Sequence, residues 1–107
     1  MIPRITQIAL LVREYDEAII WFGRALGFVV LEDSDLGDGK RWVRVAPTAD
    51  AAFNLLLARA TNERQLAAVG NQHGGRVGFF LRTDDFWRDH ARLAAGGARI
   101  DGEPREE

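Results

Sequence analysis

Two polar residues whose side chains bear on metal and anion chemistry stand at the start of two similar apolar stretches. Gln7 precedes residues 8–12 and Arg76 precedes residues 77–81, so the two are 69 positions apart. A glutamine carbonyl oxygen can bind a metal cation, whereas a guanidinium has only donors and a fixed positive charge. A guanidinium instead binds carboxylate or phosphate through two parallel hydrogen bonds. The pair therefore favours an anionic ligand over a metal.

The elements that hold these residues are predicted from the spacing of apolar side chains. Apolar runs or alternation predict strands, and apolar residues three and four positions apart predict helices. Strands are expected over residues 5–12, 28–32, 41–46, 51–59 and 77–82, with a short last one over 98–101. Helices are expected over residues 16–26, about 62–69 and about 85–95. A cluster of Asp, Ser and Gly over 33–40 predicts a turn, and the whole pattern predicts an α+β fold.

The two halves of the chain follow the same order of elements. At the offset that matches Gln7 with Arg76, Asp16 matches Asp85 and Gly27 matches Gly96. Such matching indicates a repeated supersecondary unit, with chance matching of short apolar strands as the alternative. The sequence predicts one domain, residues 1–107, with a first module over about 1–60, a linker over 61–75 and a partial second module over 76–107.

The composition limits the classes of partner. The chain has 107 residues, 47% of them apolar and 28% charged, with a net charge of −2. This charge gives no overall attraction to nucleic acid or to an anionic membrane. The chain has no cysteine, which excludes disulfides and thiolate metal sites, and its longest apolar runs are strand-sized. We expect a cytoplasmic protein that has neither nucleic acid nor a membrane as its partner.

Four stretches of the sequence carry a resemblance to a known superfamily. They are QIALLVREYDEAIIWFGRALGF in the first half, RWVRVAP and FNLLL after it, and VGFFLRTDDFWRDHARLAAGG in the second half. Together they resemble the vicinal oxygen chelate superfamily, also called the glyoxalase/bleomycin resistance protein/dioxygenase superfamily, over essentially the whole chain. The resemblance implies paired βαβββ modules that form a curled mixed sheet around a cavity. The superfamily includes metal-dependent enzymes as well as proteins that bind drugs without a metal, so the resemblance allows either activity.

The resemblance places three residues of this chain at metal-ligand positions. Metal-dependent members have His or Gln at the first position, Glu at the second and His at the third, where this chain has Gln7, Asn54 and Arg76. Because Asn is a weak ligand and Arg repels a cation, we expect no metal and no other cofactor. The alternative is a lyase, isomerase or dioxygenase that holds nickel, zinc, iron or manganese with ligands from further C-terminal strands or a partner chain. Whether the protein is an enzyme stays open.

The second module is short by comparison with the superfamily. The resemblance implies three strands after its helix and the sequence predicts one, so we expect about 25 residues to be absent. Either the chain continues beyond Glu107 or another protomer supplies the strands. We expect a homodimer in both cases, because proteins normally pair or cover an exposed sheet edge.

Alternation along the strands divides the side chains between two faces of the sheet. The face expected under the helices carries Ile8, Leu10, Val12, Val43, Val45, Phe53, Leu55, Leu57, Val77, Phe79 and Leu81. The opposite face, which the resemblance places around the cavity, carries the residues predicted to bind a small molecule: Gln7, Trp42, Arg44, Asn54, Arg76 and Phe80. Arginine suits a carboxylate or phosphate and Trp42 suits a planar ring. Alternatively, the arginines pair with acidic residues such as Glu32 or Asp33, and Trp42 lies in a dimer interface.

Three other polar residues are given structural roles. His90 lies among charged residues in a predicted helix, which favours a solvent-exposed side chain. Asp84 and Asp85 are expected to begin that helix rather than to form a catalytic acid pair, because helix starts favour acidic side chains.

Overall fold

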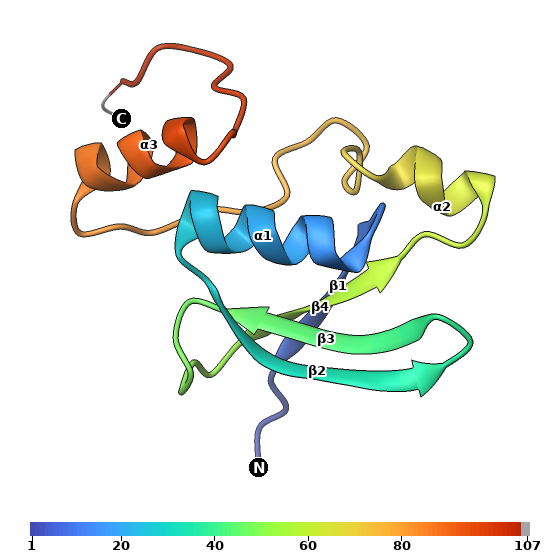
Figure 1. The fold of residues 1–107 in the computed structure, drawn as a ribbon. Helices are drawn as coiled ribbons and strands as arrows, with labels where there is room; N and C mark the ends of the chain where they lie inside the picture. The colour runs from blue at the N-terminus through green and yellow to red at the C-terminus, as the bar shows by residue number, and fades with distance from the viewer. Residues whose placement is uncertain (106–107) are drawn as a thin grey trace.

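The computed structural model describes residues 1–105, so the last two residues of the predicted second module lie outside the described residues. In chain order its elements are β1 (Gln7–Val12), α1 (Tyr15–Leu26), β2 (Val29–Gly37), β3 (Lys40–Ala46), β4 (Asn54–Arg59), α2 (Glu63–Ala68) and α3 (Phe86–Ala95). The strands form one open, curled sheet in the order β1-β4-β3-β2, with α1 lying across it (Figure 1). This arrangement confirms the α+β fold, with one complete βαβββ module. Within residues 1–105 no helix has the length and apolar character needed to cross a membrane.

The sheet combines parallel and antiparallel pairs. β1 runs parallel to β4, whereas β3 runs antiparallel to both β4 and β2. The hairpin between β2 and β3 turns at Asp38 and Gly39, which have φ angles of 55° and 77°. An Asp-Gly pair with positive φ is sufficient for a two-residue turn. The turn predicted over 33–40 is therefore wrong for residues 33–37, which continue β2 in the ladder opposite β3.

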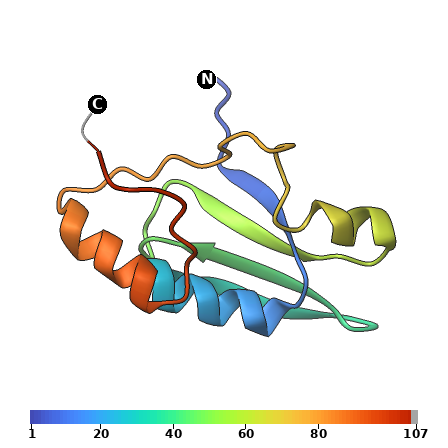
Figure 2. The same ribbon diagram turned by 90° about the horizontal axis from the view of Figure 1, so that it is seen from above.

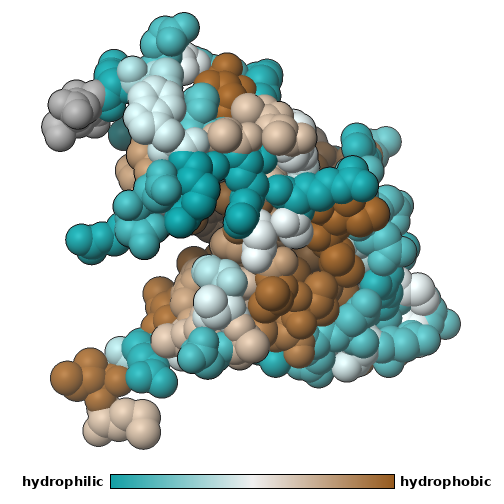
Figure 3. All heavy atoms as spheres, turned by 60° about the vertical axis from the view of Figure 1, so that its left-hand side comes forward, coloured by the Kyte–Doolittle hydropathy of each residue, from teal (hydrophilic) through white to brown (hydrophobic). Residues whose placement is uncertain are grey.

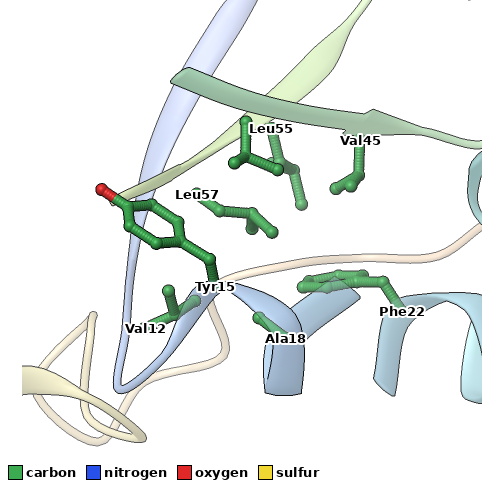
Figure 4. Close-up of a cluster of buried hydrophobic side chains, with 8 residues drawn as sticks. Val12, Tyr15, Ala18, Phe22, Val45, Leu55 and Leu57 are labelled. Atoms are coloured by element: carbon green, nitrogen blue, oxygen red, sulfur yellow. The ribbon is translucent and has the colours of Figure 1, made fainter. Parts of the chain in front are cut away.

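The hydrophobic core lies between α1 and the sheet. Its buried residues are Val12, Tyr15, Ala18, Phe22, Val43, Val45, Leu55 and Leu57, most of them labelled in Figure 4. Alternation places two core residues of β3 and two of β4 on the same face, so the predicted helix-facing sets of these strands are confirmed. Ile8 and Phe53, from the same predicted set, are 39% and 38% exposed. Neither lies on the strands β2, β3 and β4 against which α1 packs.

The two helices that the predicted repeat matches, α1 and α3, lie side by side (Figure 2). α1 ends at Gly27, which has a left-handed φ of 68° and donates its N–H to the carbonyl of Gly23. Gly96 at the end of α3 has a φ of −81°, and the left-handed residue there is Gly97. A Cβ on Gly96 would lie 2.6 Å from the Cα of Ala25. Gly96 therefore allows α3 to pack closely on α1. Unlike Gly27, it does not adopt the left-handed conformation that ends the helix.

Residues 77–82 do not form the predicted strand. They run from the loop after α2 to the start of α3, and no strand pairs with them among residues 1–105 (Figure 1). The side chains of Val77, Phe79 and Leu81, expected under the helices, are 68%, 47% and 53% exposed. A strand needs a neighbour to satisfy its N–H and C=O groups, and an apolar sequence pattern cannot supply one. The short strand predicted over 98–101 is likewise absent from the described structure.

The loop that precedes residues 77–82 is fastened to the outer edge of β1. The side-chain amide of Gln72 accepts a hydrogen bond from the N–H of Leu11 (3.2 Å) and donates one to the carbonyl oxygen of Leu11 (2.6 Å). These two bonds reproduce the pair that a residue of a neighbouring strand would make. The ring of His73 contacts that of Phe79 edge-on, with centroids 5.7 Å apart. These contacts hold the loop at the edge of β1, from which the chain continues through residues 77–82 to α3.

Candidate functional site

Two amide side chains meet on the sheet face opposite the core. Gln7 of β1 and Asn54 of β4 are direct partners in the parallel ladder, and Nε2 of Gln7 donates to Oδ1 of Asn54 (2.9 Å). Nδ2 of Asn54 also donates to the carbonyl oxygen of Thr6 (3.4 Å). Within residues 1–105 these bonds leave the carbonyl oxygen of Gln7 as an available acceptor. The pair is thus preorganised to receive a hydrogen-bond donor.

An arginine and a glutamate form the central polar pair of the same face. Arg44 of β3 lies opposite Glu32 of β2, and its Nε donates to Oε1 of Glu32 (3.0 Å). The hydroxyl of Ser34 donates to the other oxygen of Glu32 (3.1 Å). The alternative that Arg44 pairs with Glu32 is therefore confirmed. Among the contacts described for residues 1–105, this bond uses only Nε, so the two terminal nitrogens of the guanidinium are left to bind an acceptor.

An aromatic and apolar strip runs beside these polar groups. Trp42 lies opposite Ser34 and its side chain is 37% exposed. On the other side of Arg44 the sheet presents Leu56, which is in turn opposite Ala9. The face therefore offers a flat ring and small apolar side chains next to an arginine, as many small-molecule sites do.

The hairpin end of the sheet holds a second charged group that the sequence interpretation missed. Arg41 donates from Nε and Nη2 to the two carboxylate oxygens of Asp33 (3.1 and 2.7 Å) and from Nη2 to Asp16 at the start of α1 (2.9 Å). The hydrogen bonds from Arg41 lower the pKa of Asp33 below its ordinary value of 3.8. The Arg41 guanidinium also lies 5.1 Å from the centre of the Tyr15 ring. This group joins α1 to the hairpin, so Asp33 is occupied by Arg41 rather than by Arg44 or Arg76.

The two site residues predicted from the second half lie elsewhere. Arg76 is exposed beside the glycine-rich loop and lines a surface hollow with Gly70, Gln72 and His73. Phe80 is 88% exposed and lines, together with Asn54, an apolar pocket on the helix side of the sheet. The structure therefore brings four of the six predicted residues onto one sheet face: Gln7, Trp42, Arg44 and Asn54. Arg76 lies away from this face, and Phe80 meets Asn54 only at the pocket on the helix side.

The residues at the metal positions of the superfamily do not fit a divalent cation. The side-chain oxygen of Asn54 already accepts a hydrogen bond from Gln7, and Arg76 has only donors. Within residues 1–105, no three or more His, Cys, Asp or Glu side chains are grouped so that they could hold a metal ion. One neutral carbonyl oxygen is a poor donor set for nickel, zinc, iron or manganese, which bind through imidazole and carboxylate groups.

The α3 residues include one correction and one confirmed assignment. His90 is not simply solvent-exposed, since its Nε2 is buried without a hydrogen-bond partner among the described residues. The centroid of its ring lies 5.6 Å from that of Phe86 and 5.7 Å from that of Trp87. Asp85 caps the helix as expected, because its Oδ1 accepts from the N–H of Arg88 (3.1 Å).

Comparison of the sequence with known proteins identifies one family. The family model described as Glyoxalase/Bleomycin resistance protein/Dioxygenase superfamily matches residues 4–107. An uncharacterized protein of Shewanella frigidimarina (strain NCIMB 400) is 45% identical over 104 residues, which cover 96% of this chain and 77% of that protein.

Two solved structures share the fold. The crystal structure of UcmS2 matches with a TM-score of 0.80 and 22% identity, covering 100% of this chain and 84% of that one. TnmS3, an antibiotic binding protein from Streptomyces sp. CB03234, matches with a TM-score of 0.63 and 28% identity, covering 98% of this chain and 79% of that one. Because the family model matches residues 4–107, the chain belongs to the glyoxalase/bleomycin resistance protein/dioxygenase superfamily.

Proposed function

We propose that this protein binds a small molecule on the exposed face of its sheet and does so without a catalytic metal. The observation that carries the proposal is the arrangement of Arg44 beside Trp42, with a guanidinium whose terminal nitrogens are available next to an exposed indole ring. The guanidinium would bind a carboxylate or similar acceptor, and the indole would stack on a planar ring. A planar aromatic carboxylate is therefore the ligand class that this face suits best.

The amide pair adds a directional contact to this site. The carbonyl oxygen of Gln7, available among the described contacts, would accept from a hydroxyl or amine of the ligand, while Asn54 holds the Gln7 side chain in place. Structural similarity to TnmS3, an antibiotic binding protein, supports small-molecule binding as the general activity. Binding and release without bond changes needs neither a general base nor a metal, in keeping with the absence of a suitable donor set at Gln7 and Asn54.

We also propose that the site is closed by a second copy of the chain. The sheet is open and curled, and an open face is too shallow to bury most of a ligand, as small-molecule sites normally do. Two copies related by a twofold axis would place one such face against another. Sedimentation of the purified protein should then show a dimer, and a monomer at all concentrations would contradict this part of the proposal.

A thermal-shift screen of aromatic carboxylates and uncharged aromatic compounds tests the proposal. Stabilisation by carboxylates should be lost in Arg44→Ala and retained in Arg76→Ala, because Arg76 lies away from the face. Absence of stabilisation by any compound would count against binding. Equal losses in the two variants would contradict the assignment to Arg44.

A further inference from the structure

A pocket of about 550 Å³ lies on the helix side of the sheet, away from the proposed ligand face. Its floor is formed by Val45 and Leu55, and part of its wall by Phe22 of α1. Phe79 and Leu81, from the segment that crosses to α3, close it on another side. The volume falls within the range of about 300–1,000 Å³ that is usual for small-molecule sites. In the view that brings α3 forward, the surface is hollowed and hydrophobic side chains gather beside the hollow (Figure 3).

The chemistry of the lining is uniform. Six of the lining residues are aromatic: Trp21, Phe22, Phe28, Phe53, Phe79 and Phe80. Among the described residues that line the pocket, none is charged, and Asn54 contributes the one amide side chain. That amide is engaged with Gln7 and the carbonyl of Thr6, so its polar atoms are already satisfied. A lining of this kind offers ring contacts and dispersion, with no partner for a charged group.

From this lining we infer that the pocket binds an uncharged aromatic molecule. An anion would lose its hydration here without gaining a cation, which is strongly unfavourable. An uncharged aromatic molecule with few polar groups loses little hydration on entry.

The exposure of the pocket rim supports an occupant of this kind. Phe79, Phe80 and Leu81 are 47%, 88% and 53% exposed, although each is a large apolar residue. A contiguous apolar surface of this sort usually marks a binding site. An occupant would remove part of these side chains from water, at roughly 25 cal/mol per Å² of apolar surface buried.

This pocket lies on the other side of the sheet from Arg44 and Trp42, and Asn54, at the end of β4, is the residue that both sites share. Val45 and Leu55 face the helices, whereas their neighbours Arg44 and Leu56 face the other way. The two sites also differ in ligand class, since one offers a guanidinium and the other no charge. Either can therefore fail without the other.

Titration with N-phenyl-1-naphthylamine, an uncharged aromatic dye that fluoresces in apolar surroundings, tests the inference. The dye should bind the wild-type protein with one-to-one stoichiometry. Leu81→Gln should weaken binding about tenfold, because its amide would enter the apolar rim without a partner. Leu36→Gln is the matched control, since Leu36 is 52% exposed, lies in β2 and does not line the pocket, whereas Leu81 is 53% exposed.

Two further variants make the result decisive. Phe80→Gln removes an 88% exposed ring of the rim and tests the pocket without disturbing the core, and it should also weaken binding. Trp42→Ala changes the other face and shows whether the dye binds there instead. The inference is overturned if the dye does not bind, if Trp42→Ala abolishes binding, or if Leu36→Gln and Leu81→Gln weaken it equally. It is also overturned if binding declines as the protein dimerises at higher concentration, because a second copy would then fill the pocket.

Discussion

Nε2 of Gln7 lies 2.9 Å from Oδ1 of Asn54. The two residues are the first of the parallel strands β1 and β4 and lie opposite each other in the ladder. The bond decides which atom can contact a ligand, because the Asn54 oxygen already accepts a hydrogen bond whereas the Gln7 oxygen is an available acceptor among the described contacts. Gln7 and Asn54, which the sequence resemblance assigned to metal-ligand positions, are thereby a hydrogen-bonded pair with one available acceptor among the described contacts. The chemistry of the sheet face follows from that orientation.

Metal analysis of the purified protein checks the prediction that Gln7 and Asn54 do not hold a metal ion. We expect no stoichiometric nickel, zinc, iron or manganese, since Gln7 offers one neutral oxygen and Arg76 none. Removing the Gln7 amide in Gln7→Ala should leave the metal content unchanged. Stoichiometric metal in the wild type that disappears in Gln7→Ala would contradict the absence of a metal site.

Gly96→Ala should destabilise the packing of α3 on α1. The new Cβ would lie 2.6 Å from the Cα of Ala25 and 2.7 Å from its backbone nitrogen, so the two helices must separate. Such overpacking costs about 1–3 kcal/mol, measured as a loss in the free energy of unfolding. Gly102→Ala is the control, because a Cβ on Gly102 meets no atom within 4 Å. Equal stability of the two variants would show that the helix contact at Ala25 is wrong.

The stability of the hairpin end should depend on acid pH through Asp33. Hydrogen bonds from Arg41 lower the pKa of Asp33 in the folded state below 3.8, so the ionised carboxylate is favoured by folding. Its contribution is complete above pH 3.8 and is lost as the pH falls through the folded-state pKa. Thermal melts of wild type and Asp33→Asn should differ near neutral pH and converge in stronger acid. A difference in melting temperature between the two proteins that grows as the pH falls would contradict a lowered pKa of Asp33 in the folded state.

Gln72→Ala should release the outer edge of β1. The variant loses the two hydrogen bonds to Leu11, each contributing about 0.5–1.5 kcal/mol, so the Leu11 amide should exchange with solvent faster. An exposed strand edge also favours pairing between chains, and the variant should self-associate more strongly than the wild type. Gln72→Glu separates the two bonds, because a carboxylate accepts from the N–H but cannot donate to the carbonyl. An unchanged rate of hydrogen exchange at the Leu11 amide in Gln72→Ala would show that Gln72 does not protect the edge of β1.

The sequence was informative where local pattern decides the structure. Alternation in residues 43–45 and 54–58 placed the core side chains of β3 and β4 on the correct face, and the acidic residue at 85 correctly marked a helix cap. The matched glycines at 27 and 96 correctly marked two helix ends. Their conformations differ because Gly96 is placed by its contact with Ala25, a tertiary relationship that a repeat pattern does not contain.

The sequence was less informative where structure depends on a partner. Residues 77–82 have the apolar pattern of a strand, but no described strand lies beside them to form a ladder. The same limit applies to the candidate site. Alternation brought Gln7, Asn54, Trp42 and Arg44 to one face, while Arg76 was assigned there through the repeat and lies at the glycine loop instead. The two hydrogen bonds of Gln72 to β1 join residues 61 positions apart, and no sequence signal predicts them.

Calorimetric titration of the best aromatic carboxylate from the screen, into wild-type protein and into Arg44→Ala and Trp42→Ala, tests the central claim most directly. Binding to the wild type should be saturable. It should be weakened about tenfold or more in each variant, because Arg44→Ala loses the partner of the carboxylate and Trp42→Ala loses the stacking ring. Leu36→Gln should bind as the wild type does. Binding that is equally strong in all four proteins, or absent from the wild type, would contradict a ligand site on this face of the sheet.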